Sequence, residues 1–222
     1  MADIYGGQAA AGLPRYLLSD AARIVDVPRA TVHSWVNGRA GAGGDRGALI
    51  APASPRALSF TNLVELHVLR AMRRVHRVSM ANVRDALATL AQRIPDPHPL
   101  ATQDFLTDGQ DLFIEALGRL EKLSNTQQLG MHEHLRLHLD RIERDEVGLA
   151  RRLYPFMGDE RSIVVDPRIS FGRPVIEGTG VPIENVAERF DAGESEAELS
   201  ADFGLSLEQI RQALRAAARD AA

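Results

Sequence analysis

Cysteine is absent from the 222 residues of this chain. Its absence excludes disulfides and thiolate metal sites and is typical of proteins from a reducing cytosol. The sequence also lacks an apolar run long enough to span a membrane. Its Gly/Ala-rich start lacks the basic residues and apolar core of a signal peptide. We therefore expect a cytoplasmic protein without membrane contact, beginning with a disordered tail over residues 1–14.

Patterns typical of catalysis are missing as well. There is no nucleophile elbow, and the stretch from Gly172 to Gly178 has neither the spacing nor the Lys of a Walker loop. His134 and His138 are spaced i, i+4, but Leu135 stands where a zinc peptidase helix needs Glu. The polar neighbours of these histidines favour a solvated helix face over a metal site. We expect no enzyme, metal or cofactor; an enzyme built on this histidine helix is the alternative, testable by metal analysis.

The charges are divided unevenly along the chain. Residues 1–94 hold twelve Lys/Arg and six Asp/Glu, a balance of +6, whereas residues 95–222 hold fourteen and twenty-four, a balance of −10. A basic first part followed by an acidic second part favours nucleic acid as a partner of the first part only. The length allows either one large domain or two small ones.

Residues 15–39 have the pattern of a helix-turn-helix. Ser19 is expected to cap the first helix, Asp26 lies at the turn, and Pro28 stands where a second helix begins. Asp tolerates the left-handed backbone that this turn requires. Trp35 is expected to pack beneath the second helix. An ordinary helical hairpin is the alternative interpretation of this stretch.

The residues after position 39 favour a helix-turn-helix over an ordinary helical hairpin. Residues 39–57 are rich in Gly, Ala, Pro and Arg, with a short apolar piece at 48–50, as expected of a β-wing. Apolar residues from Phe60 to Met72 then recur at helical spacing, and Ser79 opens another helix. This series resembles the winged-helix DNA-binding domain of the MerR group, which implies such a domain over residues 15–94.

The resemblance implies that the second helix is the recognition helix. Its N-terminal residues are expected to reach base edges, and nearby arginines to contact phosphates. The expected base-reading residues are Arg29, Thr31, His33, Ser34 and Asn37, and the expected phosphate contacts are Arg23, Arg39 and Arg46. Arg70, Arg73, Arg74 and Arg77 on the later helix fit either the DNA backbone or a solvated face.

The segment 95–99 (PDPHP) contains several helix breakers and is expected to end the first domain. The pattern of residues 104–117 predicts a β-hairpin that turns at Asp108-Gly109. A helix near 125–142 and strands within 147–166 that pair with the hairpin complete a connecting region over residues 101–158.

The stretch 168–182 (RISFGRPVIEGTGVP) carries three glycines and two prolines just before helix-forming residues. It predicts a short strand or hairpin that turns sharply into a helix near Pro182. The stretch resembles a small bacterial domain of unknown function with the pattern D-P-x-I-x-x-G-x-P-V-I-x-G-T-x-x-P, matched here from Asp166 to Pro182. The common form has Arg where this chain has Gly180. The resemblance implies a link with VapB-like antitoxins, whose partner toxins are PIN-type ribonucleases.

Three short helices are predicted after this stretch, over residues 182–192, 195–203 and 206–219. Ser195 and Ser206 are expected to cap the last two, with Glu198 and Gln209 completing capping boxes. This trihelical unit resembles a second helix-turn-helix. However, residues 177–208 contain nine acidic residues and one basic residue, which DNA would repel.

The sequence therefore predicts a mainly α (α+β) protein with a winged helix-turn-helix domain and a toxin-binding domain over residues 159–222. We expect a homodimeric antitoxin that represses its own operon and neutralises a PIN-type ribonuclease. The expected toxin-binding residues are Arg168, Arg173, Glu177, Thr179, Glu184 and Glu188. Either an arginine plugs the carboxylate-rich toxin site, or the acidic helices cover the RNA path. The alternative is a stand-alone MerR-like regulator with a ligand-sensing C-terminal domain.

Overall fold

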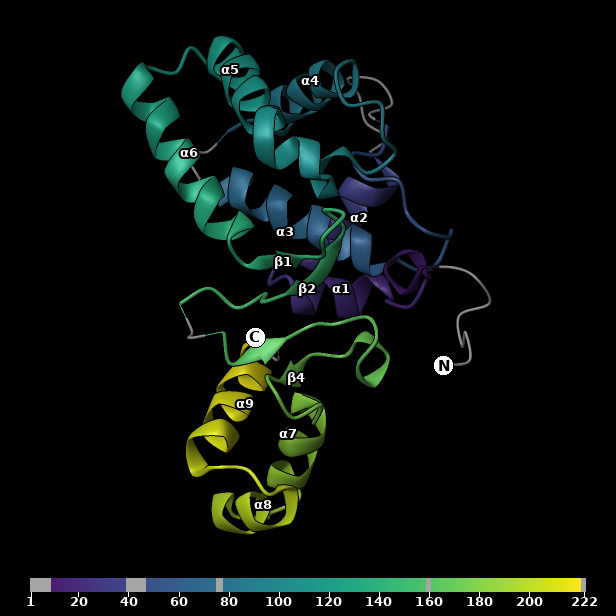
Figure 1. Ribbon diagram of the computed structural model, residues 1–222, viewed down its shortest axis with the longest axis vertical. Helices are drawn as coiled ribbons and strands as arrows, with labels where there is room; N and C mark the ends of the chain where they lie inside the picture. The colour runs from purple at the N-terminus through teal and green to yellow at the C-terminus, as the bar shows by residue number, and fades with distance from the viewer. Residues whose placement is uncertain (1–8, 39–46, 75–77, 159–160, 221–222) are drawn as a thin grey trace.

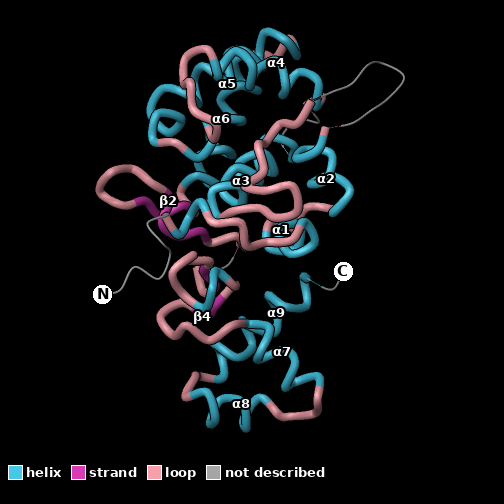
Figure 2. The backbone as a smooth tube through the Cα atoms, turned by 90° about the vertical axis from the view of Figure 1, so that its right-hand side faces the viewer, coloured by secondary structure: helices cyan, strands magenta, loops and turns pink. Residues whose placement is uncertain are grey.

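The structure, a computed structural model, describes residues 9–38, 47–74, 78–158 and 161–220. Figure 1 shows helices α1 to α6 with strands β1 and β2 in an upper block, and helices α7 to α9 with β4 in a lower block. Helices dominate and the strands are short pieces (Figure 2). This is the mainly α architecture that the sequence predicts.

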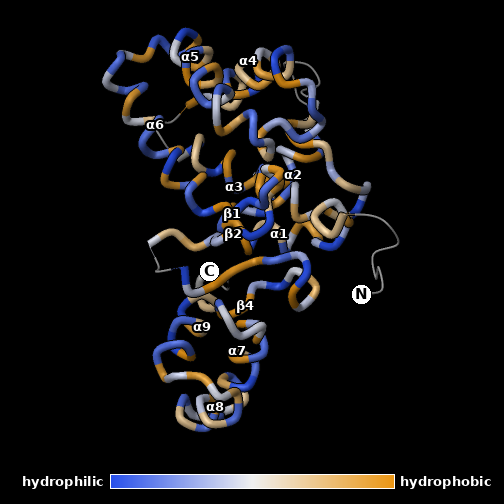
Figure 3. Tube along the Cα trace, in the orientation of Figure 1, coloured by the Kyte–Doolittle hydropathy of each residue, from blue (hydrophilic) through white to orange (hydrophobic). Residues whose placement is uncertain are grey.

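The upper block is built around one long helix that is almost wholly buried. It contains α1 (Leu18–Ile24), α2 (Arg29–Asn37), α3 (Phe60–Arg74) and α4 (Met80–Ala91). Phe60, Leu63 and Leu66 of α3 are fully buried at helical spacing, and Figure 3 shows the apolar residues of α3 in the middle of this block. Ser79 caps α4 by accepting a hydrogen bond from the N–H of Asn82, as predicted.

The β-hairpin predicted at residues 104–117 is wrong. Phe105–Gly109 forms a π-helical turn that continues into α5 (Gln110–Glu121). Gly109 has a helical φ of −67°, and a Cβ there would lie 2.9 Å from the side chain of Ile94. This glycine therefore permits close packing and does not make a turn. Phe113 and Leu117 continue the helical spacing into the core.

The segments around α5 also differ from expectation. A 3-10 helix, η2 (Pro99–Ala101), follows the proline-rich segment, and Leu100, Phe105 and Phe113 share one hydrophobic cluster with Val32 and Trp35 of α2. The chain thus bends at residues 95–99 without leaving the core. Residues 10–12, assigned by sequence to a disordered tail, form another 3-10 helix, η1 (Ala10–Gly12), and Thr61 donates a hydrogen bond to the carbonyl of Ala11. Residues 1–8 of that tail lie outside the described residues.

Helix α6 (Asn125–Leu139) leads into the first sheet. Strand β1 (Ile142–Arg144) pairs antiparallel with β2 (Ala150–Leu153). Strands are therefore present within residues 147–166 as predicted, but they pair with β1 and β4, because the expected hairpin is a helix. At residues 48–50, where a wing strand was expected, the N–H groups of Leu49 and Ile50 bond the carbonyl of Trp35 instead.

The lower block has its own core. Strand β3 (Ile163–Val164) pairs antiparallel with β4 (Val175–Ile176), followed by α7 (Ile183–Asp191), α8 (Glu196–Phe203) and α9 (Leu207–Asp220). The predicted helix starts are confirmed, with a capping box at Ser195 and Glu198 and equivalent hydrogen bonds between Ser206 and Gln209. Ile183, Val186, Leu199, Ile210 and Ala213 fill the core between the three helices.

The two blocks meet through backbone as well as side chains. Leu153 and Val165 exchange backbone hydrogen bonds of 3.0 and 2.8 Å, so the second block begins as an extension of β2. The last 3-10 helix, η4 (Ser170–Gly172), lies in the connection between β3 and β4. No helix in the described part of the chain is both long and apolar enough to cross a lipid bilayer.

Candidate functional site

The turn between α1 and α2 sets the position of the candidate recognition helix. Asp26 adopts the left-handed backbone expected of it, with φ of 49°. The buried guanidinium of Arg70 on α3 donates a hydrogen bond to the Asp26 carboxylate. Ala22, Val32 and Trp35 are buried beneath the turn. The predicted cap is wrong, because α1 begins at Leu18 and Ser19 lies inside the helix.

Helix α2 presents a polar face to solvent. Arg29, His33 and Asn37 are exposed and recur at i, i+4 and i+8, so they lie along one face. Thr31 and Ser34 are half-buried at its edge, and Thr31 accepts a hydrogen bond of 2.9 Å from Arg73. The geometry thus brings the five expected base-reading residues together on one accessible helix.

The expected phosphate contacts are distributed differently. The Arg23 guanidinium lies 2.6 Å from the carboxylate of Glu184 on α7, so it points toward the lower block. Arg70 is only 4% exposed and belongs to the core, not to a solvated or DNA-facing surface. Arg39, Arg46 and Arg77, and the side chain of Arg74, lie outside the described residues.

The Gly/Pro-rich stretch forms a compact set of turns. The N–H of Ile176 bonds the carbonyl of Val181 at 2.9 Å, which closes a hairpin over Gly178 and Gly180. Both glycines have positive φ, as their position in a tight turn requires. Thr179 donates its hydroxyl to the carbonyl of Ile176 at 2.8 Å and therefore supports this turn.

Two of the expected toxin-binding residues are held by internal ion pairs. Arg168 donates from Nε and Nη2 to the buried carboxylate of Asp166, at 3.0 and 2.8 Å. Burial alone would raise the pKa of Asp166, but the hydrogen bonds from Arg168 outweigh it and hold that pKa below its usual range. Glu177 accepts a hydrogen bond of 3.2 Å from Arg152, which also contacts Asp166. These side chains tie the start of the lower block to strand β2.

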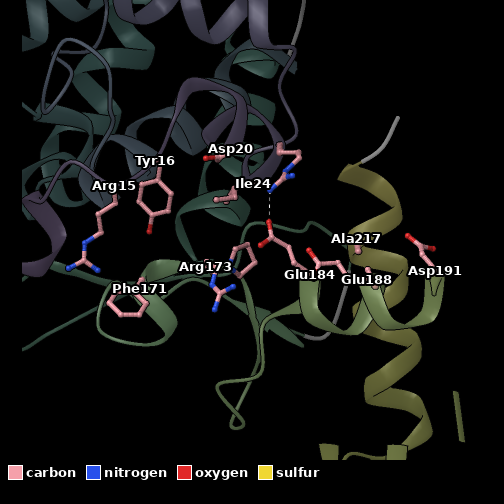
Figure 4. Close-up of a pocket in the computed structure, with 13 residues that line it drawn as sticks. Arg15, Tyr16, Asp20, Ile24, Phe171, Arg173, Glu184, Glu188, Asp191 and Ala217 are labelled. Atoms are coloured by element: carbon pink, nitrogen blue, oxygen red, sulfur yellow. Dashed lines mark hydrogen bonds and ion pairs between the residues drawn. The ribbon is translucent and has the colours of Figure 1, made fainter. Parts of the chain in front are cut away.

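The remaining expected residues line a cleft of about 630 Å³ between α1 and the lower block. Figure 4 shows Phe171 of η4 and Arg173, the residue that follows η4, toward one end of the cleft. Toward the other end, α7 contributes Glu184, Glu188 and Asp191. Arg15, Tyr16 and Asp20 close the cleft from the upper block. Arg173, Glu188 and Asp191 are exposed, so the cleft is open to a partner.

Sequence reasoning missed Tyr16 and Phe171. Tyr16 is buried and donates its hydroxyl hydrogen to the carbonyl of Gly172 at 2.9 Å, a contact across 156 residues. Phe171 follows no helical or strand periodicity and is 83% exposed. The nearest sequence signal is its place before Gly172, in a stretch already recognised as turn-forming.

The histidines of α6 show no metal-binding geometry. The buried ring of His138 contacts the rings of His134 and His67 at centroid distances of 4.6 and 5.2 Å. Among the residues that the structure describes, no group of three or more His, Cys, Asp or Glu side chains is arranged to hold a metal ion.

Comparison with known proteins extends along nearly the whole chain. A family model for a protein of unknown function (DUF433) matches residues 163–216. The chain is 32% identical to "Putative antitoxin VapB45" of Mycobacterium tuberculosis (strain ATCC 25618 / H37Rv), over 93% of this chain and 95% of that protein. It is 28% identical to the uncharacterized protein Rv2308 of the same strain, over 90% of this chain and 88% of the relative. The X-ray crystal structure of Rv2018 from Mycobacterium tuberculosis superposes with a TM-score of 0.71 at 29% identity, covering 91% of this chain and 98% of that chain.

Proposed function

The chain belongs to the family of "Putative antitoxin VapB45", and from this premise we propose that it is the DNA-binding antitoxin of a type II toxin–antitoxin system. In this role it represses its own operon through α2 and neutralises a PIN-type ribonuclease through the lower block. It acts as a homodimer in the cytoplasm and has no catalytic activity of its own. The observation that carries the proposal is likeness to an antitoxin across both blocks, not within one of them.

The DNA half of the proposal is supported by the exposed face of α2. Arg29, His33 and Asn37 supply donors and acceptors of the kind that read base edges in the major groove. The helix is supported from behind by α3, through the Arg70–Asp26 contact. A single helix covers few base pairs, so a two-fold partner on a palindromic operator supplies the remaining contacts.

The toxin half is supported by charge. A ribonuclease needs a basic surface for RNA, and residues 177–208 contain nine acidic residues and one basic residue. Glu184 and Glu188 face the cleft along α7. Arg173 is exposed beside them and is the arginine better placed to reach a carboxylate-rich toxin site, because Arg168 is bonded to Asp166.

Co-expression tests the proposal directly. The full chain is produced with a tag, together with a PIN-type ribonuclease, which the proposal expects a neighbouring gene to encode. We expect the ribonuclease to co-purify, to lose RNA cleavage in the complex, and to be released by denaturation. A ribonuclease that stays fully active at equimolar chain would contradict the toxin half. Absence of salt-sensitive binding to the upstream DNA would contradict the other half.

One observation favours a second candidate function. The cleft of about 630 Å³ falls within the range of small-molecule sites and lies against α1, next to the recognition helix. A ligand in this cleft could shift α1, which makes a stand-alone MerR-like regulator the alternative. Operator binding without any co-purifying ribonuclease, together with a small molecule retained by the purified chain, would favour this alternative.

A further inference from the structure

The turn at η4 combines three consecutive residues in the left-handed backbone region. Ser170, Phe171 and Gly172 have φ values of 45°, 58° and 80°. Glycine adopts this conformation freely, but Ser and Phe do so at a cost in free energy, and bulky residues there are rare. Only Gly172 adopts this backbone without a cost. The cost at Ser170 and Phe171 must be offset by other interactions of the fold or of a partner.

The fold holds this turn from three directions. Ser170 donates its hydroxyl to the carbonyl of Gly180 at 2.7 Å, and the N–H of Gly172 bonds the carbonyl of Ile169 at 2.8 Å. From the upper block, Tyr16 bonds the carbonyl of Gly172. A Cβ on Gly172 would lie 2.2 Å from the Tyr16 hydroxyl oxygen, so the two blocks are in close contact here. The backbone on either side of Phe171 is therefore fixed.

The fixed backbone points an aromatic ring into solvent. Phe171 is 83% exposed, more than any other large apolar side chain in the described part of the chain. It consequently gains little from burial while its backbone is strained. Nothing among the residues that the structure describes explains a phenylalanine here, because glycine would satisfy the backbone better and would expose no apolar surface.

We propose that Phe171 is the aromatic anchor of this chain for its protein partner. The inference rests on the proposed function and takes the ribonuclease as the partner. The ring inserts into an apolar pocket of the ribonuclease, while the acidic side chains of Glu188 and Asp191 across the cleft meet basic side chains around that pocket. Arg173, two residues from Phe171, adds a second residue of the type that dominates interface energetics.

Rigidity and charge both favour this occupant. An anchor on a fixed turn loses little conformational entropy on binding. The acidic side chains of Glu188 and Asp191, across the cleft from Phe171, would repel DNA, so insertion of the ring between bases is disfavoured. A second copy of the chain in a two-fold contact would place the same acidic residues near one another. A basic protein with an apolar pocket avoids both penalties.

The test separates backbone strain from partner binding. Phe171→Gly removes the ring and also relieves the backbone, so the thermal midpoint of the full chain should stay equal or rise. Its dissociation constant for the neighbouring PIN-type ribonuclease, measured by calorimetry, should increase about 30-fold or more, as for an interface anchor. Phe171→Asn, which also tolerates a left-handed backbone, serves as the second variant and should lose binding equally.

Two matched controls accompany these variants. Lys122→Gly relieves the same left-handed backbone at the end of α5, where φ is 54°. Leu129→Ala removes another exposed apolar side chain, 65% accessible on α6. Both should bind the ribonuclease like the unmodified chain.

Three other results would overturn either the anchor role of Phe171 or the proposed function. If the unmodified chain binds the ribonuclease and both Phe171 variants bind it equally well, the anchor is overturned while the proposed function stands. If the variants instead lose self-association or operator binding, the occupant is a second copy or DNA, and the inference is overturned as well. If the unmodified chain does not bind the ribonuclease, the proposed function is overturned and the anchor with it.

Discussion

The hydroxyl group of Tyr16 donates a hydrogen bond of 2.9 Å to the carbonyl oxygen of Gly172, joining the start of the upper block to the turn that presents Phe171. Arg15 adds a hydrogen bond of 2.8 Å to the carbonyl of Pro167. Burial raises the pKa of Tyr16 well above its ordinary value, so this hydroxyl stays protonated and donates throughout the ordinary pH range.

The first prediction concerns Gly172. Gly172→Ala should lower the free energy of unfolding by about 2–5 kcal/mol, the sum of a left-handed alanine and a steric clash. The clash arises because the new Cβ would lie 2.2 Å from the Tyr16 hydroxyl oxygen, at a φ of +80°. Urea unfolding of both proteins measures the difference.

Gly204→Ala is the matched control, because Gly204 has a φ of +65° but nothing within 4 Å of its Cβ position. It should cost only about 1–2 kcal/mol, and equal losses for the two variants would contradict the steric argument.

The helix pair and the C-terminal helices were predictable because their determinants are local. Asp26 makes the turn by its own tolerance of positive φ, and Ser195 caps α8 through a residue three positions away. The hairpin predicted at Gly109 is wrong because the role of this glycine is non-local. Only the packed structure reveals the Ile94 side chain 2.9 Å from where its Cβ would be.

The candidate site was predictable in part for the same reason. Arg29, His33 and Asn37 were found because helical spacing alone puts them on one face. Arg168 and Arg23 were expected to be available to partners, yet Asp166 and Glu184 bind them. The Arg23–Glu184 pair joins residues 161 positions apart, which no periodicity reveals.

The second prediction concerns pH. Burial lowers the pKa of His67 to about 3, against about 6.5 in an unfolded chain. As the pH falls below 6.5, only the unfolded state binds this proton. The contribution of neutral His67 to the free energy of unfolding is therefore complete above pH 6.5 and decreases as the pH falls toward 3. His67→Gln should remove this loss. The difference in unfolding free energy between the unmodified chain and the variant should therefore shrink by about 2 kcal/mol from pH 7 to pH 5.

The measurement must compare the unmodified chain with His67→Gln, because a second pair of titratable groups, Glu65 and His98, changes the stability with pH in the opposite direction. Burial raises the pKa of Glu65, and the hydrogen bond that the His98 ring donates to the Glu65 carboxylate raises the pKa of His98. Groups with raised pKa values stabilise the fold at low pH and lose that contribution as the pH rises through the folded value. His33→Gln on the exposed face of α2 is the control for the effect of replacing a histidine by glutamine as such. Parallel profiles for the unmodified chain and His67→Gln would contradict the assignment.

The third prediction concerns α2, the proposed recognition helix. Arg29→Ala should weaken operator binding by about 1–3 kcal/mol and relax the sequence preference, because a bidentate arginine discriminates between bases. Arg119→Ala removes the same charge from α5, where the side chain is 67% exposed, and should leave affinity nearly unchanged. Fluorescence anisotropy with the operator and with scrambled DNA measures both effects. An equal loss on the two DNA sequences would assign Arg29 to phosphate.

The fourth prediction concerns Arg173. If this arginine plugs the ribonuclease site, Arg173→Ala should abolish inhibition of RNA cleavage at concentrations where the complex still forms. If the acidic residues of α7 cover the RNA path instead, inhibition should persist, and Glu188→Gln should weaken binding in a salt-dependent manner. Arg168→Ala cannot decide between these possibilities, because it also leaves the buried Asp166 carboxylate without its main partner.

The last prediction concerns the ion pair between the blocks. Arg23 and Glu184 side chains are 39% and 32% exposed, so their contact contributes at most about 1 kcal/mol to stability. Its larger effect is on charge beside α1, where Glu184 neutralises an arginine suited to a phosphate. Glu184→Gln should therefore tighten operator binding. It should also steepen the dependence of affinity on salt by the slope expected of about one additional phosphate contact.

Glu188→Gln provides the control, since it makes the same change one turn further along the same face of α7, beside the cleft. If both variants shift the affinity equally, the general acidity of α7 is responsible and the contact between Arg23 and Glu184 is not. If Glu184→Gln alone steepens the salt dependence, and Arg23→Ala in that background removes the gain, the ion pair sets how strongly α1 contacts DNA.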